Sequence, residues 1–211
     1  DILTNYELGW KSTWMDGQLR WIGALYYIEW EDMQYSVYDF ALSPVTNTYN
    51  VGEAEITGLE TDLTYQVSEA WTVYGSMAYK DGETADDFEL ANGAVSSPSG
   101  TELPNVPELK YTLTSRYEFN MLGQDSYAQA TYSYTDDSYN DIRPSRRIQQ
   151  DDYSNLNVSA GFSAGSWGAE LYVNNLTNET DNIAVGNRAY EPSATTQRPR
   201  TIGVSLSLSF D

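Results

Sequence analysis

The stretch from Arg200 to Phe210, with the sequence RTIGVSLSLSF, decides the fold. Its apolar residues occupy every second position, and the positions between them hold only Thr, Gly and Ser: the apolar set is Ile202, Val204, Leu206, Leu208 and Phe210. Because successive strand side chains point to opposite faces, this pattern predicts a strand with one apolar face and one small polar face. A half-buried strand of a soluble sandwich and a strand of a transmembrane barrel both fit it.

Composition excludes several classes of function. The chain has 211 residues, enough for one large all-β domain or two small ones, with 31 acidic and 11 basic residues and a net charge of −20. Such a surface repels nucleic-acid phosphates. The absence of Cys excludes disulfides and thiolate chemistry, and the absence of His excludes Ser-His-Asp and Cys-His catalysis. We therefore expect no enzyme, no catalytic residues, no cofactor and no metal site.

The aromatic content points to a boundary between apolar and wet surroundings. Aromatic residues make up 14% of the chain and include 18 Tyr and 6 Trp. Mean hydropathy is −0.53, and no apolar run approaches the roughly 18 residues of a membrane helix, although alternating barrel strands give no such run either. The opening DILTNYELGW has no basic start and no apolar core, so we expect no signal peptide: it has been removed, or the chain is a piece of a longer one.

Alternation along the chain predicts about nine strands in an antiparallel up-and-down meander. Their expected ranges are 5–14, 18–35, 49–67, 71–79, 110–119, 127–134, 155–162, 167–174 and 201–210. In the second of these, the expected apolar face is shared by Ile22, Ala24, Tyr26, Ile28 and Trp30.

The predicted connections alternate between short and long. Short turns fall at Asp16, Ser68, Asn120 and Ala164, whereas long loops span 36–48, 80–108, 135–152 and 175–199. In a meander, every second connection lies at the same end of the sheet. One end therefore has only short turns, and the other has only long loops. Outer-membrane barrels have this asymmetry, with short periplasmic turns and long outer loops. We expect the long loops to be extracellular and the C-terminus to be periplasmic.

Aromatic residues at apolar positions beside the short turns suggest an interfacial girdle. They are Trp14, Trp71, Phe119, Phe162, Trp167 and Phe210. The polar positions instead carry charges suited to a water-filled interior: Lys11, Glu60, Asp62, Lys110, Arg116, Glu118 and Glu170. In a sandwich these charges would face bulk water, so alternation alone leaves both folds open.

Three stretches together resemble the C-terminal part of the β-barrel domain of TonB-dependent outer-membrane receptors. The first is NYELGWKSTWMDGQLRW at 5–21, followed by ALYYIEWEDMQ at 24–34. The second is NVGEAEITGLETDLTYQVSEAWTVYGSMAY at 50–79. The third is YVNNLTNE at 172–179 with RPRTIGVSLSLSF at 198–210. Each stretch alone is weakly specific, but the three in this order are fairly specific, and the likeness extends over nearly the whole chain.

The resemblance implies a plugged barrel of about 22 strands that imports a scarce nutrient, such as a ferric siderophore, with energy relayed by the TonB complex. Residues 1–211 would be the C-terminal portion of that barrel, with the plug, the TonB-binding region and the N-terminal strands absent. Implied partners are outer-membrane lipid and lipopolysaccharide, the TonB complex through the missing region, and the barrel assembly machinery through the C-terminal strand. The family's terminal aromatic corresponds to Phe210, which Asp211 follows here.

Candidate ligand-binding residues lie in the long loops. Arginine forks suit carboxylate or phosphate groups, and loop tyrosines can stack on a chelator or a sugar. The candidates are Arg143, Arg146, Arg147, Arg188, Tyr139 and Tyr190. Salt bridges to neighbouring acidic loops are the alternative role of these arginines. The acidic run 81–89 is expected to be a solvated loop rather than a calcium site.

Two other functions stay open at this stage. One is a passive porin-like barrel, which would need no plug. The other is a soluble secreted β-sandwich that binds glycans through exposed Tyr and Trp.

Overall fold

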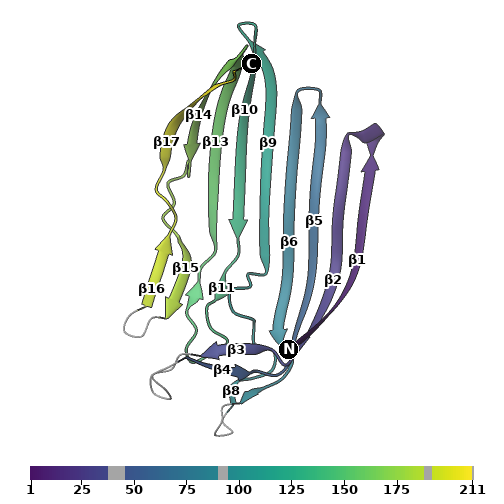
Figure 1. Ribbon diagram of the computed structural model, residues 1–211, viewed down its shortest axis with the longest axis vertical. Coiled ribbons are helices and arrows are strands. Elements are labelled where there is room, and N and C mark those ends of the chain that lie inside the picture. The colour runs from purple at the N-terminus through teal and green to yellow at the C-terminus, as the bar shows by residue number, and fades with distance from the viewer. Residues whose placement is uncertain (38–45, 90–94, 188–191, 211) are drawn as a thin grey trace.

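One antiparallel sheet of nine long strands forms the body of the molecule, a computed structural model that describes residues 1–37, 46–89, 95–187 and 192–210 (Figure 1). The strand order β1-β2-β5-β6-β9-β10-β13-β14-β17 follows the chain, which confirms the predicted meander. The nine strands are β1 (Ile2–Trp14), β2 (Leu19–Glu31), β5 (Ala54–Ser68), β6 (Trp71–Thr84), β9 (Leu109–Met121), β10 (Gln124–Thr135), β13 (Tyr153–Ala164), β14 (Trp167–Asn174) and β17 (Thr201–Leu208).

The long connections contain strands that alternation did not predict. Each carries a short hairpin: β3 (Gln34–Val37) with β4 (Asn47–Asn50), β7 (Phe88–Glu89) with β8 (Val95–Ser97), β11 (Ser138–Tyr139) with β12 (Gln149–Gln150), and β15 (Asn182–Asn187) with β16 (Pro192–Thr196). The expected second strand therefore ends at Glu31 rather than Tyr35, and β6 continues to Thr84, within the predicted loop. These hairpins have two to six residues per strand, too few for a clear period-two pattern.

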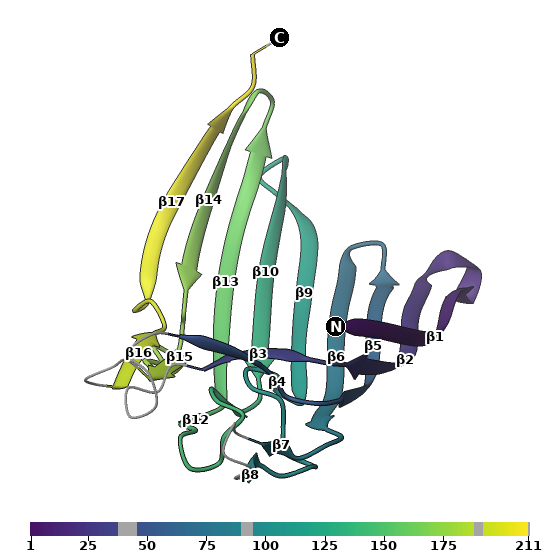
Figure 2. The same ribbon diagram turned by 60° about the horizontal axis from the view of Figure 1, so that its bottom comes forward.

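Short and long connections alternate as predicted. A 3-10 turn, η1 (Met15–Gly17), and three tight turns join strand pairs at one end, which we call the short-turn end. All four extra hairpins lie at the opposite end, the loop end (Figures 1 and 2). Within the described residues no helix is long and apolar enough to cross a bilayer.

Strand register divides the sheet into an apolar face and a polar face. Directly opposed residues share a face. One unbroken row runs from Phe119 through Ser126 and Phe162 to Ala169 and Leu206. Extending such rows places all the predicted polar-position charges on the other face, as expected.

The second strand is the exception, because its predicted apolar face is wrong. Leu25 opposes Leu59, which opposes Tyr79, so the odd-numbered residues of β2 belong to the apolar face. Ile22 opposes Lys11 and Asp62 and therefore lies on the polar face. Both faces of β2 are rich in apolar residues, and only pairing with neighbouring strands distinguishes them.

The apolar face has no second layer over it within the described residues. Leu113 is 50% exposed and Leu206 is 76% exposed, although both lie within paired strands, β9 and β17. Figure 2 shows a single curved layer rather than two packed sheets. This arrangement is that of a barrel wall and not of a sandwich, whose inner face would be buried.

Candidate functional site

Three long connections interlock at the loop end and enclose the buried apolar cluster of the described chain. Its members come from residues 32–53, 85–108 and 136–152 and from the first residue of β5: Met33, Val51, Ala54, Phe88, Leu103 and Ile142. Tyr49 of β4 packs on Phe88 with ring centroids 6.0 Å apart. Because each segment alone is too short to bury such side chains, they fold against one another.

Hydrogen bonds fix the same three connections together. The Ser97 hydroxyl donates to the carbonyl of Ile142 over 2.9 Å, and the amide of Ile142 donates to the Tyr35 hydroxyl at 3.5 Å. The amide of Asn105 donates to the carbonyl of Tyr139 over 2.7 Å. The described parts of these three connections thus form one packed, hydrogen-bonded unit.

Arg143 lies inside this unit rather than on its surface. Its side chain is 8% exposed and forms a two-pronged pair with Asp141, with Nε and Nη2 at 2.9 and 2.6 Å from the two carboxylate oxygens. The backbone amide of Arg143 also donates to Asp141. Burial, followed by the negative charge of Asp141, raises the pKa of the nearby Tyr35 hydroxyl. The pair stabilises the loop unit from within.

A tight turn after Arg143 carries the other two arginines outward. The amides of Arg146 and Arg147 both donate to the Arg143 carbonyl, at 2.9 and 3.0 Å. Arg146 is exposed, and the guanidinium of Arg147 lies 3.7 Å above the ring of Tyr139. The structure thus groups three candidate residues, Tyr139, Arg146 and Arg147, around the buried Arg143. Arg188 and Tyr190 lie outside the described residues.

A second polar assembly, which sequence reasoning missed, joins the last loop to the sheet. The side chain of Asn175 is buried; its Nδ2 donates to the carbonyls of Glu179 and Arg198 at 2.7 and 2.9 Å, and its Oδ1 accepts from the Glu179 amide. Its φ of 53° is a left-handed conformation that Asn tolerates well. Asn175 begins the Asn-Leu-Thr triplet of the YVNNLTNE stretch, which resembles the family. This triplet was the only signal in the sequence that could have pointed to Asn175.

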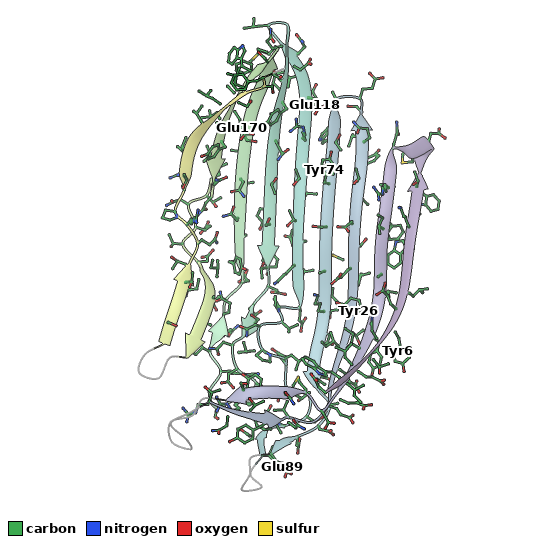
Figure 3. The ribbon with its side chains drawn as sticks, viewed as in Figure 1. Tyr6, Tyr26, Tyr74, Glu89, Glu118 and Glu170 are labelled. Atoms are coloured by element: carbon green, nitrogen blue, oxygen red, sulfur yellow. The ribbon has the colours of Figure 1, made fainter. Side chains whose placement is uncertain are left out.

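The polar face below the loop unit is lined by charged and hydroxyl side chains. Lys80 pairs with Glu60 at 3.3 Å and Arg116 with Glu118 at 2.9 Å. The Tyr127 hydroxyl donates to Glu170. Figure 3 places Glu118 and Glu170 towards the short-turn end. This face suits contact with water or polar protein, and not with hydrocarbon.

Five of the six predicted girdle residues lie on the apolar side of the sheet near the short turns, and the sixth, Phe210, follows the end of β17. Phe162 and Trp167 meet edge to face with centroids 5.3 Å apart, and Phe119 stacks with Tyr117 at 6.1 Å. Trp14, Trp71 and Phe210 are all exposed. Among the described residues, which include the acidic run 81–89, no three acidic side chains are grouped so that they could bind a metal ion.

Comparisons with known proteins agree with this geometry. A family profile described as "TonB dependent receptor-like, beta-barrel" matches residues 3–176. A probable TonB-dependent siderophore receptor, PiuA of Acinetobacter baumannii, is 24% identical over 182 residues, covering 82% of this chain and 23% of its own. The chain therefore spans less than a third of this relative.

Solved structures show the same fold. The ferric yersiniabactin uptake receptor FyuA from Yersinia pestis superposes with a TM-score of 0.80 at 19% identity, over 99% of this chain and 30% of its own. The copper transporter OprC superposes with a TM-score of 0.75 at 17% identity, over 99% of this chain and 31% of its own. Proteins of this fold thus have different cargoes, and the fold does not identify the cargo of this one.

Proposed function

The chain belongs to the TonB-dependent receptor-like β-barrel family, and from this premise we propose that it forms part of an active outer-membrane transporter for a ferric siderophore. The family consists of outer-membrane barrels, and siderophore uptake is carried over from relatives such as PiuA. The chain supplies residues 1–211 as the C-terminal portion of the barrel.

One observation supports the transport proposal most strongly. The loop end is a packed unit that carries Arg146, Arg147 and Tyr139, while one face of the sheet is polar and the opposite face is bare and apolar. A wall with lipid on one side and a polar passage on the other needs both features. An entrance that is already packed and hydrogen-bonded before the ligand arrives loses less entropy when the ligand binds.

We propose that Arg146 and Arg147 contact anionic groups of the incoming chelate and that Tyr139 orients Arg147. Arg143 positions this turn through Asp141. Arg188 and Tyr190 are proposed as additional contacts from the last loop. Guanidinium groups bind carboxylate, catecholate and hydroxamate oxygens through charge-assisted hydrogen bonds.

We also propose the membrane placement of the two ends. The aromatic girdle Trp14, Trp71, Phe119, Phe162, Trp167 and Phe210 would lie in the periplasmic interface, with the loop end outside the cell. The apolar face contacts lipid, the loop end lies beside lipopolysaccharide, the C-terminal strand engages the barrel assembly machinery, and TonB acts through a region outside this chain.

Uptake of radioactive iron tests the proposal. Cells carrying the protein should accumulate iron from at least one of a set of hydroxamate, catecholate and mixed siderophores, and a protonophore or loss of TonB should abolish the uptake. Uptake that survives both treatments would instead indicate the passive porin-like barrel. Replacing Arg146 and Arg147 together by Gln should weaken ligand binding at least tenfold. The matched variant R20Q, on the polar face near the short-turn end, should bind normally.

A further inference from the structure

We propose that two short turns anchor the barrel wall in the adjoining lipid leaflet, by inserting the side chains of Met15 and Leu122 among the lipid headgroups. The proposal rests on the membrane placement given above, and it adds a lipid-binding role to turns that connect strands.

Leu122 combines unusual exposure with an unusual backbone. It sits at the tip of the β9–β10 turn, its side chain is 94% exposed, and its φ is 56°. The left-handed conformation is unfavourable for a bulky non-glycine residue, and Asn or Asp adopts it more readily. Nothing among the described residues covers this leucine, so they offer no contact that would compensate for the unfavourable backbone.

Met15 repeats the combination in a different hairpin. Its φ is also 56°, it is 56% exposed, and it follows the exposed Trp14 at the end of β1. The β13–β14 turn instead uses Gly165 in the left-handed conformation, and the β5–β6 turn carries the exposed Glu69. Two of the four turns therefore begin with an exposed apolar residue in the left-handed conformation, and in the first of them Met15 is followed by Asp16.

Both turn residues directly follow the last apolar-face residue of a strand: Met15 follows Trp14, and Leu122 follows Met121. Met121 is exposed at the end of the strand that carries Tyr117 and Phe119. Since Phe119 shares a row with Phe162, this turn lies next to the aromatic band of the neighbouring strands. Because the two turns adjoin the lipid-facing surface, lipid is the favoured partner of their exposed side chains. A soluble protein would need polar contacts, which Met15 and Leu122 do not offer.

Fluorescence quenching by brominated lipid tests the anchor. This chain contains no Cys, so single cysteines carrying a bimane label can replace Leu122, Met15, Leu206 and Glu69. The protein would be purified from outer membranes and placed in phosphatidylcholine vesicles brominated near the headgroup or deep in the acyl chain. Labels at 122 and 15 should lose at least half of their emission with shallow bromine, and label 69 should lose little.

The controls separate the possible failures. If label 206 is quenched by deep bromine while labels 122 and 15 behave like label 69, the anchor is wrong and the membrane placement stands. If label 206 is also unquenched, the membrane placement itself fails. Shielding of labels 122 and 15 in cell envelopes but not in pure lipid would point to a protein partner and overturn the lipid proposal.

Asparagine variants give a second test that does not depend on the label. L122N and M15N suit the left-handed backbone but remove the apolar side chain, so the folded barrel should form in detergent as before. Its insertion into preformed vesicles should slow at least twofold. An unchanged insertion rate in the double variant would contradict the anchor.

Discussion

The hydroxyl of Tyr127 donates a hydrogen bond to the carboxylate of Glu170 across an intervening strand. The residue between them is Gly161, which opposes Tyr127 on one side and Glu170 on the other. A Cβ at Gly161 would come within 2.9 Å of the Tyr127 ring and of the Ala169 carbonyl oxygen. The contact therefore requires glycine at this position.

We predict that G161A displaces the Tyr127 ring and destabilises the sheet by about 1–3 kcal/mol, the usual range for overpacking. Thermal unfolding in detergent, followed by circular dichroism, measures the change. In the control G75A, the added methyl meets only Leu113 Cδ1 at an ordinary 3.9 Å, so a much smaller effect is expected. Equal effects of the two variants would contradict the close-approach explanation.

Loss of the Asp141 carboxylate should loosen the loop unit. D141A removes two charge-assisted hydrogen bonds to the Arg143 guanidinium. Each such bond contributes at most about 1.5–3 kcal/mol, and we expect the local free energy of unfolding of the loop unit to fall accordingly. Hydrogen exchange at the amides of Ile142 and Asn105 should accelerate, while exchange in the middle of β9 should not. D137A, at an exposed position nearby, is the matched control.

Asn175 should matter both for its bonds and for its backbone conformation. N175G keeps the left-handed backbone accessible and removes three side-chain bonds, whereas N175A adds backbone strain. We expect a loss of about 1–3 kcal/mol for N175G and a larger loss for N175A. The exposed neighbour variant N174A should be close to neutral, and a neutral N175G would contradict the role assigned to Asn175.

A row of glutamates crosses the apolar side of the sheet near the loop end. Glu29 opposes Glu55, Glu55 opposes Glu83, and Glu83 forms an isolated bridge with Glu102. Like charges directly opposite one another are destabilising, so E55Q should stabilise the protein by about 0.2–1 kcal/mol. The gain should shrink at high salt, which screens exposed charges. E69Q, in a turn, should show neither effect.

Glu108 predicts a dependence of stability on pH. Partial removal from water, followed by the charges of Asp81 and Glu102, raises the pKa of Glu108 above its usual 4.5. A raised folded-state pKa means that the folded form binds the proton more tightly, so this residue's contribution to stability falls as pH rises from 4.5 to the raised value. The difference in melting temperature between the wild type and E108Q, measured across that interval, should grow in favour of E108Q with rising pH.

Much of the wall could be predicted from the sequence because its signal is local. Period-two alternation in segments such as Thr201–Leu208 identified the strands, and the spacing between them identified the short-turn end and the loop end. Residues such as Leu113 were assigned to the correct face because their neighbours in sequence are polar. In β2 the odd-numbered and the even-numbered residues are both rich in apolar side chains, so alternation cannot distinguish the two faces. Only the pairing of β2 with β1 and β5 showed which residues lie on the apolar face of the sheet.

The sequence by itself determined that the chain forms strands with one polar and one apolar face, and that it has no His or Cys chemistry. Composition and period-two alternation can both be read directly from the order of residues. Tertiary structure alone decided the roles of the loop residues. Arg143 and Arg146 are three positions apart and identical in type, yet one is buried against Asp141 and the other is exposed. That difference arises from contacts between segments as distant as Tyr35, Ser97 and Ile142, and such contacts form only when the strands have set the loops side by side.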